Sequence, residues 1–310
     1  MRLEPWVLRW DGKMAKQIFH VNKQRFGDVR VVLAETDPAL RQTLEQHLHK
    51  IGFKDILSTD NLDEVKKAII KGHVDLLVGD AMLEDGALID LVRAMRLGFL
   101  GGNIFPVVIS MISNPTQALV NKVINSGPDN ILVKPFGVET FCERILQLTA
   151  KREPFVVTSD YIGPDRRQKQ RPGAMVIPKT QVPNPLHNKV TSFYKKSEFT
   201  NYIQRTASKI NELRIERQSF QIGYLVERIQ PDQVENEEQQ GLPPEWRRLA
   251  FTARDLANRV KGSQFSHMNG MTSTLINFVD DMEVVGVLNT NDFRLLSQLS
   301  QGISRGISLD

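Results

Sequence analysis

The order of hydrophobic and polar residues changes character along the chain. From Val29 to Ala150, short apolar runs alternate with segments whose apolar residues recur at helical spacing. The apolar runs predict five buried strands, and the segments after them predict five helices. Because these strands are apolar at nearly every position, the pattern favours a doubly wound, five-stranded parallel sheet with helices on both faces. The strands are expected at residues 31–34, 55–58, 74–78, 106–109 and 131–133.

Beyond residue 190 the pattern is helical throughout. Apolar residues recur every three or four positions in four successive stripes, which begin at Phe199, Trp246, Met271 and Phe293. This spacing predicts a bundle of about four helices. The fold class expected for the whole chain is therefore an α/β domain followed by an all-α domain.

The segment between the two patterned regions has a different composition. Residues 151–190 hold six of the fifteen prolines, and their eight basic and three acidic side chains give a net charge of +5. Such a composition predicts a basic, proline-rich linker or an extended arm. The expected boundaries are a flexible basic leader at 1–27, the α/β domain at 28–150, the linker at 151–190 and the helical bundle at 191–310.

The net charge of +4 first suggests a nucleic-acid partner. However, residues 28–150 carry twelve basic and sixteen acidic side chains, and residues 191–310 carry fourteen and fifteen. A DNA-reading domain gathers positive charge on one folded face, so nucleic acid is not an expected partner. The single cysteine, Cys142, and the lack of an apolar run of about 18 residues favour a cytoplasmic protein without a membrane span.

Ionisable side chains follow the predicted strands at the point where each strand ends. Glu35 and Asp37 follow the first strand, Asp80 follows the third, and Lys134 follows the fifth. Because the carboxyl ends of parallel strands meet at one edge of the sheet, these side chains are expected to share a pocket. Neighbouring carboxylates need a cation, and oxygen ligands suit Mg²⁺. An aspartate beside Mg²⁺ and a lysine has the surroundings of a phosphoryl acceptor.

Three stretches of residues 29–150 carry a resemblance to the receiver domain of two-component response regulators. They are Val31–Pro38, Val74–Asp80 and Ile131–Phe136, the last preceded by Ser126-Gly127. The resemblance implies a flavodoxin-like fold in which Asp80 is the phosphoacceptor and Lys134 binds the phosphoryl group. It also implies that Glu35, Asp80 and the backbone carbonyl of Met82 are Mg²⁺ ligands, and that the peptide bond before Pro135 is cis.

Two departures from the family's pattern bear on the metal site. Thr36 stands where a receiver usually has a second acid, and Asp37, one position later, is expected to point to the opposite side. Mg²⁺ is therefore an expected cofactor, but a weakly bound one. The loop Ala81–Gly86 after the acceptor is also shorter than usual and lacks the customary proline.

The switch hydroxyl of the family has no single counterpart in this sequence. Counting from Pro106 places Met111 at its position, whereas a strand that ends one residue earlier places Ser110 there. Ser110 is the preferred assignment, and Ser113 is less favoured. The receiver thus either works with weak metal binding or is a pseudo-receiver held in one state.

The helical region resembles a histidine-phosphotransfer domain in one stretch, residues 253–263. Lys261-Gly262 matches the end of the motif His-x-x-Lys-Gly, but Asn258 stands at the position of the histidine. An amide cannot carry a phosphoryl group as an imidazole does. The resemblance therefore implies a degenerate domain that is not a phosphocarrier.

The middle segment contains a motif with two interpretations. Tyr161–Arg167, with Arg171 following, could form a phosphate clamp, and Arg167 and Arg171 share the spacing of a cyclic-dinucleotide arginine motif. The β-barrel and the downstream Asp/Asn-x-Ser-x-x-Gly that belong with that motif are not found. We therefore favour an arm that docks on one of the domains.

The sequence predicts a response regulator rather than an enzyme, because the helical region shows no nucleophile–base pair or metal-ligand spacing. The expected phosphorelay protein accepts a phosphoryl group on Asp80 from a sensor histidine kinase or phosphotransfer protein, and signals through protein–protein interaction. The alternative is a pseudo-receiver scaffold without phosphotransfer, which Thr36 and Asn258 favour. A DNA-binding regulator is the weakest alternative, because the last helix has only Arg294 and Arg305 as cations.

Overall fold

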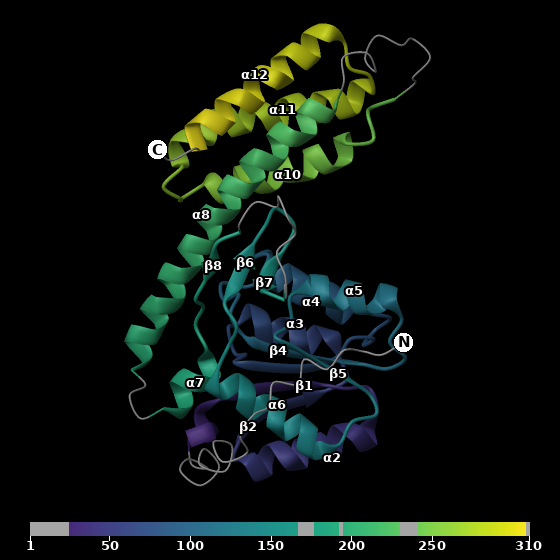
Figure 1. Ribbon diagram of the computed structural model, residues 1–310, viewed down its shortest axis with the longest axis vertical. Helices are drawn as coiled ribbons and strands as arrows, with labels where there is room; N and C mark the ends of the chain where they lie inside the picture. Colours follow the sequence, from purple (N-terminus) through teal and green to yellow (C-terminus); the bar gives the residue numbers. More distant parts are fainter. Residues whose placement is uncertain (1–24, 167–176, 192–194, 230–240, 308–310) are drawn as a thin grey trace. The chain divides into compact units, whose positions relative to one another are not determined.

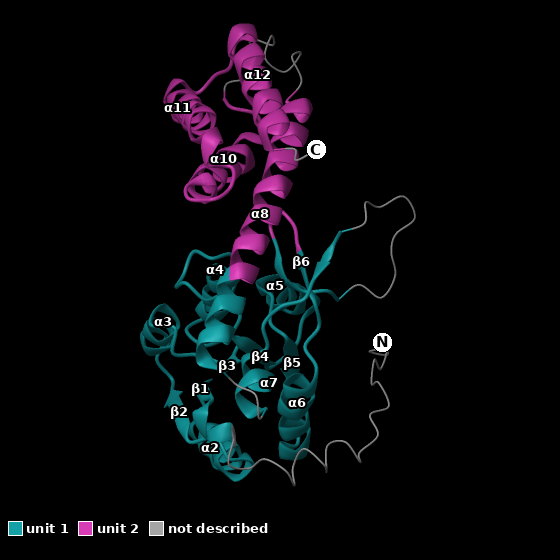
Figure 2. Ribbon diagram, turned by 90° about the vertical axis from the view of Figure 1, so that its left-hand side faces the viewer, with its two compact units in different colours: residues 1–156, 161–204 teal, residues 157–160, 205–310 magenta. Residues whose placement is uncertain are grey.

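The computed structural model describes residues 25–166, 177–191, 195–229 and 241–307 (Figure 1). Most of the predicted leader, Arg167 and Arg171 lie outside these residues. The chain divides into two compact units, shown in two colours in Figure 2. Unit 1 comprises residues 1–156 and 161–204, and unit 2 comprises residues 157–160 and 205–310.

Unit 1 is built around a five-stranded sheet in the order β2-β1-β3-β4-β5, in which all neighbouring strands are parallel. The predicted doubly wound fold is therefore confirmed. The strands are β1 (Arg30–Ala34), β2 (Asp55–Thr59), β3 (Leu76–Asp80), β4 (Val107–Ile112) and β5 (Asn130–Val133). The three central strands are buried along almost their whole length, which explains why they are apolar at successive positions.

Helices cover both faces of this sheet (Figure 1). They are α2 (Pro38–Ile51), α3 (Leu62–Ile70), α4 (Ala87–Arg96), α5 (Gln117–Ser126) and α6 (Val138–Ala150), with the short 3-10 helix η1 (Arg25–Asp28) before β1. One core lies between the sheet and the helices α2 and α6, and the other lies under α3 and α4. Asp37, Asn61 and Thr116 cap the starts of α2, α3 and α5 by accepting backbone N–H bonds.

The segment predicted as a linker forms further structure within unit 1. Strands β6 (Phe155–Val157), β7 (Ile162–Pro164) and β8 (Lys179–Thr180) make a small sheet in the order β7-β6-β8. Helix α7 (Pro185–Val190) buries Leu186 and Val190 in the core beside α6. The contacts place residues 161–204 with the α/β region rather than between two domains, because the segment buries apolar side chains that its proline-rich composition conceals.

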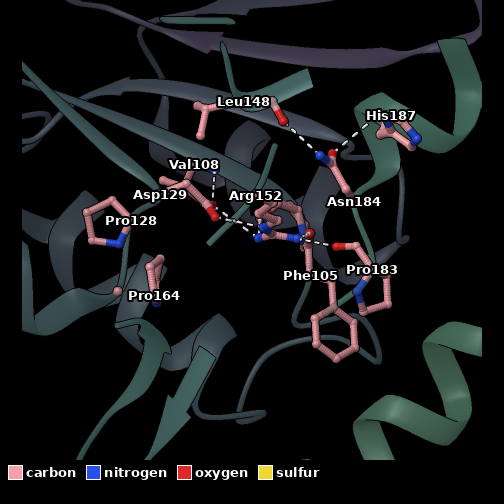
Figure 3. Close-up of polar contacts among 12 residues, drawn as sticks. Phe105, Val108, Pro128, Asp129, Leu148, Arg152, Pro164, Pro183, Asn184 and His187 are labelled. Atoms are coloured by element: carbon pink, nitrogen blue, oxygen red, sulfur yellow. Dashed lines mark hydrogen bonds and ion pairs between the residues drawn. The ribbon is translucent and has the colours of Figure 1, made fainter. Parts of the chain in front are cut away.

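A buried cluster of charged side chains connects residues 151–190 to the five-stranded sheet (Figure 3). The Asp129 carboxylate accepts from Arg152 Nε at 2.7 Å, from Arg96 Nη2 at 2.8 Å and from the Val108 amide at 2.8 Å. Arg152 also donates to three backbone carbonyls, among them that of Pro183. These bonds connect α4, β4, the start of β5 and the chain after α6, so the segment is part of the unit's interior.

The environment of the cluster shifts the ionisation of its members. Burial raises the pKa of Asp129, but Arg152 and Arg96 oppose it more strongly, and the net pKa is below the ordinary value. Burial lowers the pKa of Arg96 to about 10 despite Asp129. The ring of Phe155 on β6 lies 5.1 Å from the Arg96 guanidinium carbon and 4.9 Å from that of Arg152, so both guanidinium groups also contact an aromatic face.

The motif that starts at Tyr161 packs on the turn between α5 and β5. Arg166 donates to the carbonyl of Pro128, and the hydroxyl of Tyr161 donates to the carbonyl of Pro164. At Gly127 a Cβ atom would lie 2.6 Å from the carbonyl oxygen of Ile162. A side chain at Gly127 would therefore push β7 away, and the motif serves as a docking arm on its own unit over the described residues.

Unit 2 is helical. Its elements are the long helix α8 (Lys196–Arg228), which enters unit 2 after Gln204, α10 (Trp246–Val260), η2 (Ser266–Met268), α11 (Asn269–Val285) and α12 (Thr290–Ile307). A helical C-terminal region is thus confirmed, whereas its likeness to a phosphotransfer domain stays a prediction. Asn258 is exposed on α10. None of the described helices has the length and apolarity needed to span a membrane.

Unit 2 also includes a short piece of chain from a distant part of the sequence. Residues 157–160, which are the last residue of β6 and the turn after it, group with the helices rather than with unit 1. Asp160 forms an ion pair with Arg248 of α10, and Ser159 donates to the side chain of Gln221 on α8. The chain therefore passes between the units at three points, after residues 156, 160 and 204.

Candidate functional site

Three of the predicted site residues meet at the carboxyl edge of the five-stranded sheet. Glu35 follows β1, Asp80 ends β3, and Lys134 follows β5. The ammonium nitrogen of Lys134 lies 2.6 Å from Oε2 of Glu35 and 2.7 Å from Oδ2 of Asp80. One lysine therefore bridges the two carboxylates, as the convergence of parallel strands predicts.

Backbone contacts hold Lys134 in this position. Its amide donates to the carbonyl of Ile112 at 2.8 Å, which extends the pairing of β5 with β4. The Lys134–Pro135 peptide bond is cis, as the resemblance implied. The side chains of Glu35 and Asp80 are 1% and 8% exposed, and that of Lys134 is 14% exposed. The triad is consequently shielded from most of the solvent.

The two carboxylates determine the charge state of Lys134. Burial lowers the pKa of the Lys134 ammonium, but its hydrogen bonds to Asp80 and Glu35 and their negative charges raise that pKa more, and the net shift is upward. The lysine therefore remains protonated over the whole neutral range. A permanent positive charge beside Asp80 is what an incoming phosphoryl group requires.

The loop after Asp80 places a backbone donor against the acceptor. The amide of Met82 donates to Oδ1 of Asp80 at 2.8 Å, while the Met82 side chain is exposed. Glu84, Asp85 and Gly86 all have positive φ angles, and the Glu84 carboxylate accepts from the amide of Leu62 at 3.0 Å. This bond connects the tight loop to the start of α3 and holds it in place, although the loop lacks the customary proline.

The acids after β1 do not enter the pocket together. Oε1 of Glu35 accepts from the Asp37 amide at 3.0 Å and from the Thr36 hydroxyl at 3.5 Å. The Asp37 carboxylate instead accepts from the amides of Ala39 and Leu40, at 2.9 and 3.2 Å, and caps α2. The Asp37 carboxylate is thus used at the start of α2, and the residue between Glu35 and Asp37 in the sequence is the neutral Thr36.

The register of β3 and β4 bears on the switch hydroxyl. Asp80 is paired with Met111, and Ser110 is paired with Gly79, one position earlier. Side chains alternate along a strand, so Ser110 lies on the face opposite to Met111. Among the described residues, no hydrogen bond connects Ser110 with Asp80 or Lys134. The structure therefore does not bring the preferred Ser110 into the pocket, and buried Met111 holds the position beside the acceptor.

Arg41 is a neighbour of the pocket that sequence reasoning missed. It donates from Nη1 to the backbone carbonyl of Glu35 and pairs with Asp60 at 3.0 Å. The sequence contained a signal for Arg41: it lies one helical turn after the cap Asp37, and a side chain there can face the end of β1, which precedes α2. Arg41 holds the backbone of Glu35 in place, and its own charge is paired with Asp60.

The residues present fit a Mg²⁺ ion poorly. Carboxylate oxygens are the right donors, but each of the four oxygens of Glu35 and Asp80 already accepts a hydrogen bond from the protein. Among the described residues, no group of three or more His, Cys, Asp or Glu side chains is placed to hold a metal ion. Lys134 thus provides the positive charge of the pocket.

Comparison with known proteins identifies the α/β region. Residues 31–146 match the response regulator receiver domain family, and this part of the chain is a receiver domain. Such a domain indicates a response regulator function in a two-component system. A comparison with curated proteins gave no match.

Solved structures with similarity to the chain include two response regulators. One is HP1043, an orphan response regulator of H. pylori, with 22% identity, a TM-score of 0.34, and coverage of 38% of this chain and 94% of the other. The second is a response regulator signal receiver domain from Bermanella marisrubri, with 19% identity, a TM-score of 0.33, and coverage of 38% and 95%.

Proposed function

We propose that the receiver domain accepts a phosphoryl group on Asp80 from a phosphohistidine of a sensor histidine kinase or phosphotransfer protein. The observation that carries this proposal is the bridge of Lys134 between Asp80 and Glu35 at the carboxyl edge of the sheet. The signal then passes to another protein through contacts rather than through an enzymatic or DNA-reading activity. A cytoplasmic location, expected from the sequence, stays a prediction.

The proposed step uses groups that the pocket holds. An oxygen of Asp80 attacks phosphorus, the bond from phosphorus to the histidine nitrogen breaks, and that nitrogen keeps the electron pair and takes a proton from solvent. The product is an acyl phosphate on Asp80 and a neutral histidine on the partner. The Lys134 ammonium, 2.7 Å from Asp80, neutralises charge on the phosphoryl oxygens.

A small phosphodonor tests the proposal directly. After incubation of the full chain with acetyl phosphate, intact-mass spectrometry should detect one added phosphoryl group. The variant Asp80→Asn should gain none, because an amide does not form the acyl phosphate. As a matched control, Asp85→Asn changes an exposed acid of the same loop and should leave the adduct unchanged. If no Asp80-dependent adduct forms under any metal condition, the proposal is wrong.

A second candidate is a receiver that signals without phosphotransfer. Neutral Thr36 after Glu35 and buried Met111 beside Asp80 favour it, since both positions lack a group that the family's chemistry uses. This candidate predicts that the phosphodonor leaves amide hydrogen exchange of β4 and α5 unchanged. The first candidate predicts a change there that Asp80→Asn abolishes.

A further inference from the structure

We infer that Lys134 takes the place of a divalent cation in this receiver domain, so that Mg²⁺ is not a resident ligand of the acidic pocket. The inference deepens the proposed function and rests on it for its meaning in signalling. It rests on the hydrogen bonds of the carboxylate oxygens, on the net charge of the pocket and on the role of Asp37 as a helix cap.

The first argument is the occupation of the carboxylate oxygens. Oε2 of Glu35 and Oδ2 of Asp80, the pair that could grip one ion, both accept from Lys134 Nζ. The other two oxygens accept backbone amides, from Asp37 and from Met82. Mg²⁺ requires oxygen ligands in near-octahedral geometry at about 2.1 Å and gives up its water reluctantly. A Mg²⁺ ion would therefore have to share each of these oxygens with a donor that is already in place.

The second argument is electrostatic. Two carboxylates and one ammonium give the pocket a net charge of −1, whereas an acid in place of Thr36 would give −2. A Mg²⁺ ion bound to the two oxygens that contact Nζ would lie within about 5 Å of the ammonium. The two cations would repel each other in a pocket that is shielded from solvent.

The third argument is that the missing acid cannot be supplied by a small movement. Asp37 follows Thr36 directly, but its carboxylate is committed to the amides of Ala39 and Leu40. Turning Asp37 into the pocket would leave the first turn of α2 without its cap, which is generally unfavourable. The carboxylate of Asp37 thus serves as the cap of α2 and not as a second acid next to Glu35. Lys134 remains the positive charge that balances Glu35 and Asp80.

The test is equilibrium Mg²⁺ binding by the full chain, measured by titration calorimetry. The wild-type chain should show no saturation in the millimolar range. Two variants each make the pocket charge −2: Thr36→Asp adds an acid, and Lys134→Met removes the ammonium. Each should bind Mg²⁺ at least about tenfold more tightly than wild type. Thr290→Asp, an added acid at the exposed start of α12, is the matched control and should change nothing.

Two results would overturn the inference. One is saturation of the wild-type chain at or below millimolar Mg²⁺ that Asp80→Asn abolishes. The other is that neither pocket variant binds Mg²⁺ better than wild type, because lysine and the missing acid then do not limit binding. If one variant fails to fold, the other variant and the wild-type titration still decide.

Mass spectrometry with acetyl phosphate separates this inference from the proposed function. Adduct formation in EDTA as well as in Mg²⁺ supports both. An adduct that needs Mg²⁺ leaves the proposed function standing and overturns the inference. A chain that binds no Mg²⁺ and forms no adduct leaves the inference standing and overturns the proposed function.

Discussion

Gly79 precedes the acceptor Asp80 on β3, and its lack of a side chain lets α4 lie close to the strand. A Cβ atom at Gly79 would lie 2.4 Å from Cδ2 of Leu88 and 3.7 Å from Cβ of Ala34. The Leu88 side chain is buried, so it has little room to withdraw. The position of Asp80 at the sheet edge therefore depends on glycine one residue earlier.

We expect Gly79→Ala to destabilise the protein by about 1–3 kcal/mol, because an added methyl group overpacks the contact with Leu88. Urea unfolding of the full chain, followed by circular dichroism, measures this loss. Gly102→Ala is the matched control, since a Cβ there has nothing within 4 Å, and its effect should stay within about 0.5 kcal/mol. Equal effects of the two substitutions would contradict the explanation.

At the level of single residues, the sequence predicted which side chains meet in the pocket better than it predicted the residues around them. The strand ends were visible in the apolar runs, so the meeting of Glu35, Asp80 and Lys134 followed from topology. The role of Asp37 could also have been recognised, because Asp followed by Pro38 is a typical helix start. The choice between Ser110 and Met111 could not, since it depends on a one-residue register that only strand pairing fixes.

At the scale of elements, the Asp129 cluster connects four segments: α4, β4, the start of β5 and the chain after α6. The Asp129 carboxylate is buried with two arginines, and the nearest of these in sequence, Arg152, is 23 residues away. No sequence pattern connects them, because buried charge pairs form between residues that are distant in the chain. For the same reason, the proline-rich composition of residues 151–190 concealed a packed segment.

We expect Asp129→Asn to cost about 3–5 kcal/mol, because Arg96 and Arg152 would remain buried without their counter-charge. Faster amide hydrogen exchange in β4 and β5 would report the loss. Asp90→Asn, which breaks the exposed pair with Lys122, should cost at most about 1 kcal/mol.

The same substitution has a defined pH dependence. The folded-state pKa of Asp129 is below its ordinary value, so ionised Asp129 contributes stability that is present above the ordinary carboxyl pKa and is lost as pH falls towards the folded-state pKa. The difference in stability between wild type and Asp129→Asn should therefore shrink from about pH 5 to pH 3. A difference that is independent of pH would contradict this account.

At the scale of the whole molecule, unit 1 does not end with the last helix of the receiver match. Phe155, Leu186 and Val190 are buried in it, and Arg152 completes the cluster around Asp129. We expect a fragment of residues 25–150 to be less stable than one of residues 25–190 by at least about 4 kcal/mol, because these apolar side chains and the charge partner are removed. Urea unfolding of the two fragments measures the difference, and equal midpoints would show that the segment after residue 150 contributes nothing.

The four residues 157–160 limit how the helical unit can be exchanged between proteins. Because they group with the helical unit while residues 156 and 161 on either side belong to unit 1, the helical unit is not one contiguous segment. A fusion made by joining residues 205–310 to another receiver would leave behind Asp160, the ion-pair partner of Arg248. A single recombination point therefore cannot exchange the helical unit intact, and an exchange has to include residues 157–160 together with residues 205–310.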